Sequence, residues 1–452
     1  MYEKSKNLYK KEKRKFDDLV SNESSDEELI EKFSTMYRSA KRICKSYVYN
    51  YKEGMLIEAI KVNDIENVHQ ILKYCNKDLI VSERDEGGRY PFYHSVTNNN
   101  MDMTKMIIYY AKVNEKKLNI NEKGPNEWYP FLIAVSENNI EMAQTIIDYA
   151  IDNGIKLEIN AKHKGGWYPI LYAAYYNNTE MVNLILDYAT KENITLDIID
   201  NKDPNGWYPL LFATNYNNNG IVKSILDYAT KNNIFLNMDD KDSNGWYPLL
   251  FATYNNNTGM VNLILNYSIS NHVNLNINDK GPNGWYPLLF AINNNNSGVV
   301  KSILDYATKM NIPLNISDKS PSGWYPLLLA TNHDNAGLVK LILDYATQNR
   351  INMDINFKNK YGFYPLQQAV NKNNVTIVNF IIDYAKKWNT ILEYNDIDIK
   401  RNKQIYHSLG EYKRKNEGLF KETAKMYQGN KIYDQKKEQS ILIYKSFLYF
   451  YL

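Results

Sequence analysis

Side chains that commonly carry acid–base, nucleophilic or metal chemistry are few in this sequence and lie far apart. No two of the six His residues stand at the spacing that places two metal ligands on one face of a helix, and Cys44 and Cys75 are not spaced as metal ligands either. The segment Gly281-Pro282-Asn283-Gly284 predicts a turn, because the Gly-Lys-Ser/Thr of a phosphate-binding loop does not follow it. We therefore expect no enzyme activity, no cofactor and no metal. The His residues are His69, His94, His163, His272, His333 and His407.

The composition is that of a folded chain with an unusual number of tyrosines. The 452 residues are 44% hydrophobic and carry a formal net charge of +3, so a packed core is expected and wholesale disorder is not. Met1 to Lys15 is charged and lacks the apolar core of a signal peptide, and no run of 18 apolar residues predicts a transmembrane segment. We expect an intracellular protein, cytoplasmic rather than nuclear. The 39 Tyr against 20 Gly suggest a periodic sequence.

The Pro residues reveal that period. Eight of them follow one another at intervals of 39 or 40 residues, and each is preceded directly by Tyr. A second Tyr follows each Pro by 19 residues, and a small residue, mostly Ala, follows it by four. Eight copies in step indicate a repeat architecture. The series is Pro91, Pro130, Pro169, Pro209, Pro248, Pro287, Pro326 and Pro365.

Each repeat predicts two short helices and a polar link. A first helix is expected at Pro209 to Tyr216, with Pro in its first turn, and a second at Ile221 to about Lys231, with apolar residues at helical spacing. Asn217 to Asn219 separate the two helices, and a short extended piece at 235–238 precedes a turn at 242–245. Two helices of this size cannot bury their apolar faces alone, so the repeats must stack as a solenoid.

The repeat resembles the ankyrin repeat. The family's Gly-x-Thr-Pro-Leu-His-x-Ala phrase aligns with residues 206–213, Gly-Trp-Tyr-Pro-Leu-Leu-Phe-Ala. The resemblance implies an all-α solenoid of helix-turn-helix units joined by β-hairpin-like loops, with about nine units over 51–396 and an N-terminal capping repeat at 51–83. The unit is about six residues longer than the family's. Tyr replaces the family's Thr, and Asn replaces Gly in the turn between the helices, a position that favours residues able to adopt positive φ.

The flanks differ from the array. Residues 1–50 are expected to be disordered and then helical, and Ser24 or Ser25 could either cap that helix or be a phosphorylation site. Residues 397–452 are basic and could hold a degenerate capping helix pair. The apolar end, 440–452, is expected to pack on the last repeat, with a peripheral membrane or partner anchor as the alternative.

Two columns of the repeat are candidates for a binding surface. The resemblance implies that the residue between Gly and Tyr of the phrase projects toward partners, and this column contains Trp128, Trp167, Trp207, Trp246, Trp285 and Trp324. These Trp residues could instead pack against neighbouring repeats, which their uniformity favours. Seven residues before each Pro lies a Lys row that includes Lys202, Lys241, Lys280 and Lys319. It is either a solvated charge row or an anion-binding site.

Variable positions at the end of the first helix are the better candidates for specificity. In the family these positions face partners, and here they contain Tyr175, Tyr176, Tyr216, Tyr254, Asn255, Asn294 and His333. The sequence therefore predicts a non-catalytic scaffold, monomeric, that binds a protein partner. The alternatives are a binder of acidic or phosphorylated ligands through the Lys and Trp columns, and a membrane-peripheral tether. The array has 30 basic and 35 acidic groups, which argues against nucleic acid as the partner.

Overall fold

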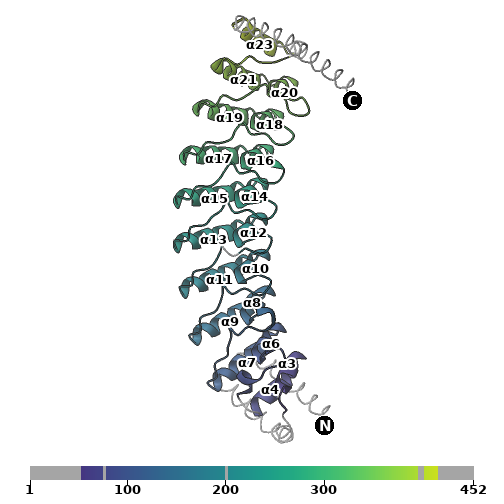
Figure 1. The fold of residues 1–452 in the computed structure, drawn as a ribbon, viewed down its shortest axis with the longest axis vertical. Helices are drawn as coiled ribbons and strands as arrows, with labels where there is room; N and C mark the ends of the chain where they lie inside the picture. Colours follow the sequence, from purple (N-terminus) through teal and green to yellow (C-terminus); the bar gives the residue numbers. More distant parts are fainter. Residues whose placement is uncertain (1–51, 75–77, 199–201, 395–401, 416–452) are drawn as a thin grey trace, which may run out of the picture. The chain divides into compact units, whose positions relative to one another are not determined.

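The computed structural model describes residues 52–74, 78–198, 202–394 and 402–415. The chain divides into two compact units, unit 1 (Met1–Asp197) and unit 2 (Ile198–Leu452), and each is a stack of helix pairs (Figure 1). The described residues contain helices and no strand, as the predicted all-α repeat fold requires. The expectations for residues 1–50, for Ser24 and Ser25 and for residues 440–452 lie outside the described residues.

Every full repeat contains a first helix that begins at its Pro and a longer second helix that packs against it. The first helices of unit 1 are α6 (Pro91–Thr97), α8 (Pro130–Ser136) and α10 (Pro169–Tyr175), and the second helices are α7 (Met101–Val113), α9 (Ile140–Asp152) and α11 (Thr179–Lys191). The first helices of unit 2 are α12 (Pro209–Asn215), α14 (Pro248–Tyr254), α16 (Pro287–Asn293), α18 (Pro326–Asn332) and α20 (Pro365–Asn371). Its second helices are α13 (Asn219–Lys231), α15 (Thr258–Ser270), α17 (Ser297–Lys309), α19 (Ala336–Gln348) and α21 (Val375–Trp388).

The first helix is short because it is an almost wholly buried layer. Tyr208 is extended at the N-cap and Pro209 occupies the first turn, where a missing N–H leaves no helical hydrogen bond unmade. All residues from Pro209 to Thr214 are buried, and Ala213 is small enough to let the neighbouring helices approach. These helices form the core of the stack in each unit.

Within each unit, Asn side chains join a repeat to the one before it. In the second helix of the α14–α15 repeat, the N-cap Asn257 accepts the N–H of Met260 through Oδ1, at 2.9 Å. Its Nδ2 donates to Oδ1 of Asn217 in the preceding repeat, at 2.7 Å. Asn217 lies in the turn between two helices with φ of 60°, as expected from Asn in place of Gly. The same amide bond recurs at the Asn139–Asn99, Asn178–Asn138, Asn296–Asn256 and Asn335–Asn295 pairs.

The two Tyr columns are a second set of connections between repeats. Tyr247, before the Pro of α14, is buried and donates its hydroxyl to the carbonyl of Asp279 in the following loop, at 2.7 Å. Tyr306, in the second helix α17, accepts the backbone N–H of Leu275 in the preceding loop, at 3.0 Å. No strand pairs the backbone of these described loops, so the Tyr hydroxyls satisfy polar groups that would otherwise be buried without a partner. Burial raises the pKa of Tyr247 well above its usual value, which keeps the hydroxyl protonated as a donor.

The ends of the array are incomplete versions of the repeat. At the N-terminal end, α3 (Met55–Lys61) and α4 (Ile65–Tyr74) form a helix pair without the Pro phrase, followed by the short α5 (Leu79–Ser82). At the other end, α23 (Lys403–Lys415) packs on α21 and repeats the pattern of a second helix. Asn402 donates a hydrogen bond to Asn373, as the N-cap Asn residues of other repeats do to the repeat before them. Tyr412 follows Asn402 by ten residues, the same spacing that separates Tyr384 from the N-cap Asn374.

We predict that Asn257→Ala lowers the free energy of unfolding by about 1–2 kcal/mol, because it removes both the helix cap and the bond to Asn217. Asn257→Asp keeps the capping oxygen but loses the donor, so it should recover only part of the loss. Urea unfolding measures both variants. Asn266→Ala, at an exposed position of the same helix, is the control and should change little. Equal stability of Asn257→Asp and the native chain would contradict the role given to the amide.

Candidate functional site

The loop before each first helix holds the Trp in place. In the α14 repeat, Oδ1 of Asp242 accepts the backbone N–H groups of Asn244 and Trp246, at 2.9 and 2.8 Å. Gly245 lies between them with φ of 88°, a conformation that a residue with a Cβ adopts only under strain. The same two bonds link Asp203 to Asn205 and Trp207 in the preceding repeat. The turn residues of the repeat therefore fix the position of the Trp backbone, from which the ring projects.

In unit 2 the Trp rings alternate with Phe rings of the first helices. The Trp246 ring stacks on Phe251 of its own repeat, with centroids 4.6 Å apart and planes at 11°, and lies 6.0 Å from Phe290 of the next repeat. Trp207 is placed in the same way, 4.7 Å from Phe212 and 5.9 Å from Phe251. Trp285 stacks on Phe290 at 5.0 Å. The stacked rings thus connect successive repeats.

Unit 1 has a shorter aromatic cluster with polar members. Trp128 stacks on His163 at 4.5 Å, and Nε2 of His163 lies 3.0 Å from the Tyr172 hydroxyl. Trp167 lies 4.9 Å from Tyr172 and meets Tyr175 edge to face at 5.2 Å. Burial lowers the pKa of His163, so the ring is neutral at neutral pH and serves as a stacking partner.

All six Trp residues of the column are half-buried, so both interpretations of the column describe part of the geometry. One ring face packs on an aromatic neighbour, as the packing interpretation requires, and part of each ring remains at the surface. Trp324 has Phe363 of the next repeat as its aromatic neighbour, at 6.3 Å. Sequence reasoning missed the Phe column, Phe212, Phe251 and Phe290, although it lies three residues after each Pro.

The four Tyr residues predicted to give specificity are all exposed, with 40% to 54% of their surface accessible. Tyr254 is the most exposed and meets both Trp246 and Phe290 edge to face, at 5.2 and 5.5 Å. Tyr216 stacks on Phe212 at 6.2 Å. In unit 1, Tyr175 and Tyr176 meet each other edge to face at 5.2 Å. Tyr175 and Tyr254 therefore contact a Trp ring directly, whereas Tyr176 and Tyr216 stack on Tyr172 and Phe212.

Asn255, Asn294 and His333 are placed differently from those Tyr residues. Nδ2 of Asn255 donates to the carbonyl of Thr214, and Nδ2 of Asn294 donates to the carbonyl of Thr253, at 3.0 and 2.8 Å. Each amide therefore caps the end of the first helix in the preceding repeat. Burial lowers the pKa of His333, against the effect of a hydrogen bond with the Asn293 backbone. These three half-buried side chains hold repeats together and offer less to a ligand than the Tyr residues do.

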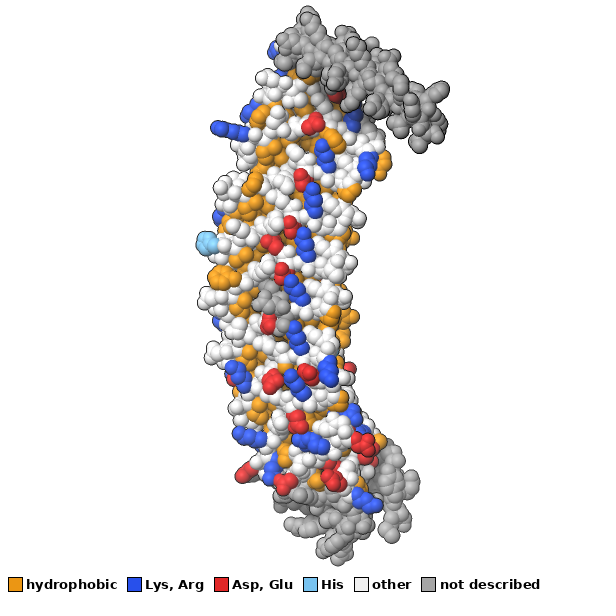
Figure 2. Space-filling model, viewed as in Figure 1, with side chains coloured by type: hydrophobic (Ala, Val, Ile, Leu, Met, Phe, Trp, Pro, Cys, Tyr) orange, Lys and Arg blue, Asp and Glu red, His pale blue; other side chains and the backbone are white. Residues whose placement is uncertain are grey.

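The Lys row is paired within the protein. Lys202, Lys241 and Lys280 form ion pairs with Asp240, Asp279 and Asp318 of the next repeat, with N–O distances of 2.5 to 2.9 Å. Figure 2 shows the resulting line of alternating basic and acidic side chains. Lys202 and Lys241 also lie over the rings of Tyr208 and Tyr247, and Lys319 lies 3.1 Å from the centroid of the Phe357 ring. This arrangement favours the charge-row interpretation over the anion-binding one.

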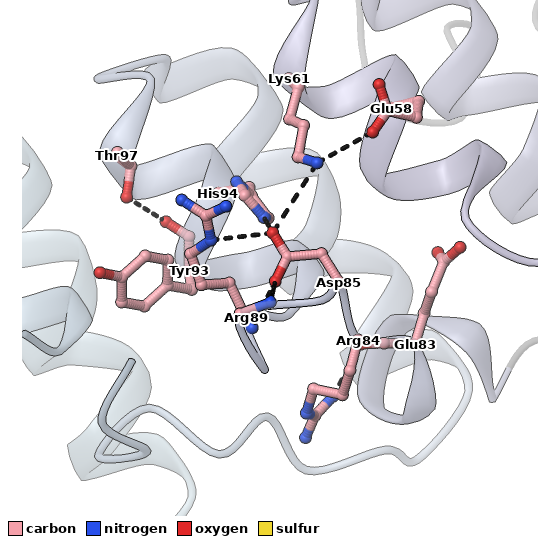
Figure 3. Close-up of polar contacts among 10 residues, drawn as sticks. Glu58, Lys61, Glu83, Arg84, Asp85, Arg89, Tyr93, His94 and Thr97 are labelled. Atoms are coloured by element: carbon pink, nitrogen blue, oxygen red, sulfur yellow. Dashed lines mark hydrogen bonds and ion pairs between the residues drawn. The ribbon is translucent and has the colours of Figure 1, made fainter. Parts of the chain in front are cut away.

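A polar cluster around Asp85 takes the place of the aromatic stack in the first full repeat (Figure 3). Oδ2 of Asp85 lies 2.8 Å from Nε of Arg89, 3.0 Å from Nε2 of His94 and 3.7 Å from Nζ of Lys61. Arg89 occupies the Trp column and His94 the Phe column, and these two departures from the repeat are the sequence signal for the cluster. The cluster ties the loop to α3 and α6.

We predict that Trp246→Ala lowers the free energy of unfolding by about 2 kcal/mol, less than the roughly 3–5 kcal/mol of a fully buried aromatic ring, because only part of the ring is covered. Trp246→Phe keeps a ring on Phe251 and should restore most of the stability. Thermal unfolding compares the two variants. An unchanged melting temperature for Trp246→Ala would mean that the ring does not stabilise the stack.

The Asp85 cluster should stabilise the fold in a pH-dependent way. Burial alone would raise the pKa of Asp85, but hydrogen bonds from the Arg89 backbone, His94 and the Arg89 side chain lower it from 3.8 to about 2. Because the folded pKa is lowered, the charge contributes stability that is present above about pH 5 and is lost as pH falls through about 2. Asp85→Asn should therefore destabilise the chain near neutrality, by an amount that shrinks on acidification.

Urea midpoints measured across that pH range test the Asp85 prediction. Asp148→Asn, at an exposed position of α9, is the control and should show no comparable loss near neutrality. A stability difference between native protein and Asp85→Asn that stays constant with pH would contradict the proposed role of the charge.

The described part of the chain offers neither a cluster of metal ligands nor a helix that could span a membrane. It contains no group of three His, Cys, Asp or Glu side chains placed to hold a metal ion. None of its helices is long and apolar enough to cross a bilayer.

Comparisons with known proteins address the family. Among solved structures, 410 chains match. One is the ankyrin repeat domain of Bcl-3, described as a unique member of the IkappaB protein family, with 18% identity over 57% of this chain and 99% of that domain, and a TM-score of 0.38. No curated protein matches the chain. The family model for ankyrin repeats in three copies matches five overlapping segments, 111–196, 155–235, 189–279, 231–315 and 310–391. These segments cover more than half of the sequence, and the chain belongs to the ankyrin-repeat family.

Proposed function

We propose that the protein is a non-catalytic scaffold that binds a protein partner through its exposed aromatic surfaces. The observation that carries the proposal is the placement of Tyr216 and Tyr254. Their rings are 40% and 54% exposed, yet Tyr216 stacks on Phe212, and Tyr254 contacts both Trp246 and Phe290. Exposed aromatic rings of this kind are enriched where proteins bind one another.

The stack beneath the Tyr residues would lower the entropic cost of binding. A Tyr side chain has two rotatable bonds, and contact with Trp246 and Phe290 restricts those of Tyr254 before a partner arrives. Less freedom is then lost on association, so more of the contact energy contributes to affinity. The hydroxyl at the tip of each ring adds a group that can donate or accept a hydrogen bond.

The family supports the same class of function. Ankyrin repeats are generally protein–protein interaction modules and are typically non-catalytic. The two alternatives have less support from the described residues. The Lys row that would bind an anion is largely occupied by Asp side chains, and the segment that would reach a membrane, 440–452, lies outside the described residues.

We predict that Tyr216→Ala combined with Tyr254→Ala abolishes capture of the partner in a pulldown with the intact chain. The physical reason is the loss of two exposed, pre-ordered anchor rings, each of the type that costs about 2 kcal/mol or more at an interface. Quantitative mass spectrometry of the captured proteins is the measurement. Because about half of each ring is exposed, the double variant should stay folded, with a melting temperature only moderately below that of the native chain.

Phe235→Ala is the matched control. Phe235 is 76% exposed but lies in the loop after α13, away from the aromatic surface, so its removal should leave capture unchanged. Capture that survives the double Tyr variant would exclude the proposed surface. Capture that falls equally with Phe235→Ala would show that exposed aromatic area in general, and not this surface, retains the partner.

A further inference from the structure

We infer that the partner segment bound by unit 2 is uncharged, rich in Pro and extended as a polyproline II helix. The inference rests on the proposed function and specifies its partner. The surface concerned is called the aromatic face of unit 2. It consists of the exposed rings of Tyr216 and Tyr254 and the half-buried rings of Trp207, Trp246, Trp285 and Phe290, and the buried rings of Phe212 and Phe251 support it from below.

Charge is the first argument. Helices α12, α14 and α16 contain no Asp, Glu, Lys or Arg, and neither do the loop tips before them, residues 204–207, 243–246 and 282–285. Asp203 and Asp242 directly precede two of these tips, but both are buried and accept the backbone N–H groups of Trp207 and Trp246. The other charged side chains of these repeats lie chiefly in the Lys–Asp row and along the second helices. A charged partner segment would lose its hydration on this face without gaining an opposite charge. The face is therefore complementary to an uncharged segment.

Unit 1 shows that an uncharged face is not imposed by the repeat itself. Its loop tips contain Glu86 and Lys164 where unit 2 has Pro or Ser, Glu127 where it has Gly, and Arg89 where it has Trp. The fold accepts charged residues at these tips, since Glu86, Glu127 and Lys164 are exposed there. The absence of charge over three successive repeats is thus a property of unit 2, and the inference is confined to it.

The period of the aromatic face is the second argument. Successive Trp rings are separated by one Phe ring that lies 4.6 to 6.0 Å from each, so the pattern repeats about every 10 Å, one helix diameter. A polyproline II helix has three residues per turn and rises about 3.1 Å per residue, so every third residue returns to the same side after about 9.3 Å. A segment with Pro at every third position can therefore place one Pro ring against each repeat.

Hydrogen bonding distinguishes this partner from an α-helix. A polyproline II segment has no internal hydrogen bonds, and its carbonyl groups can accept bonds from a partner. Tyr254 and the exposed Asn293 carry groups that can donate to them. An α-helix uses its backbone groups in its own hydrogen bonds. Its apolar side chains would lie against the same amides and hydroxyls and would offer them no acceptor. Pro-rich segments in this conformation dock on aromatic-lined surfaces of proteins.

The test is a binding titration of the intact chain with synthetic peptides of about 12–15 residues, long enough to span three or four repeats. The probe is a blocked repeat of Pro-Pro-Gln, and the comparison is a blocked repeat of Gly-Gly-Gln, which is flexible. We expect the Pro-Pro-Gln peptide to bind at least about tenfold more tightly, with an affinity that changes little with salt. Tyr254→Ala should weaken its binding about tenfold, and Phe235→Ala should not.

Further peptides decide between the inference and its alternatives. Tighter binding of Pro-Pro-Glu or Pro-Pro-Lys repeats than of Pro-Pro-Gln would overturn the assignment of an uncharged partner, and preference for a blocked amphipathic α-helical peptide would overturn the polyproline II assignment. Peptide affinity that survives in both Tyr254→Ala and Tyr216→Ala would place any binding elsewhere. If the double Tyr variant loses its cellular partner while no Pro-rich peptide binds, this inference fails and the proposed function stands. If capture of the partner and binding of the peptide are both unchanged in the Tyr variants, the inference and the proposed function both fail.

Discussion

The constraint on which the rest of the structure depends is that backbone polar groups in the loops between repeats need partners, although no described loop forms a strand. Some partners are backbone groups, such as the Asn205 carbonyl that accepts the N–H of Ser243 in the next repeat, and side chains supply many of the others. The Tyr247 hydroxyl reaches the Asp279 carbonyl, the Tyr306 hydroxyl accepts the Leu275 N–H, and Asn257 bonds both its own helix and the preceding repeat. A buried backbone group without a partner costs about 1–3 kcal/mol, so these bonds decide how closely the repeats can stack.

The aromatic face follows from that stacking. Once the Asn and Tyr bonds fix one repeat against the next, the turn at Asp242 places Trp246 between Phe251 of its own repeat and Phe290 of the next. The Trp column therefore stabilises the stack and supports Tyr254 at the surface with the same ring. A residue that packs on one side and supports an exposed ring on the other cannot be assigned to structure or binding alone.

Much of the fold could be predicted from the sequence because the same phrase occurs eight times. The Pro of the phrase marks the start of a helix in every repeat, as Pro209 does for α12. The positive φ of Asn217 is expected because Asn stands there in place of the family's Gly. The contacts between repeats could not be predicted in this way. Asn255 and Asn294 stand in a column that faces partners in the family, yet their amides cap the neighbouring helix, which depends on distances across repeats that sequence spacing does not contain. The pairing of Lys241 with Asp279, 38 residues further on, is of the same kind.

The direction of the Asn bonds has a consequence for how the chain acquires its structure. Nδ2 of Asn139, Asn178, Asn257 and Asn296 each reaches back to a residue 40 positions earlier, and the second-helix Tyr residues also reach back, to loops 31 positions earlier. During synthesis the acceptor or donor for each of these bonds has left the ribosome before the side chain that needs it. Each new helix pair can thus dock on the repeat made just before it, and it in turn supplies the acceptor that the buried Tyr of that repeat needs, as Asp279 does for Tyr247. Within each unit the stack can therefore grow in the order of translation, and each step needs only the neighbouring repeat.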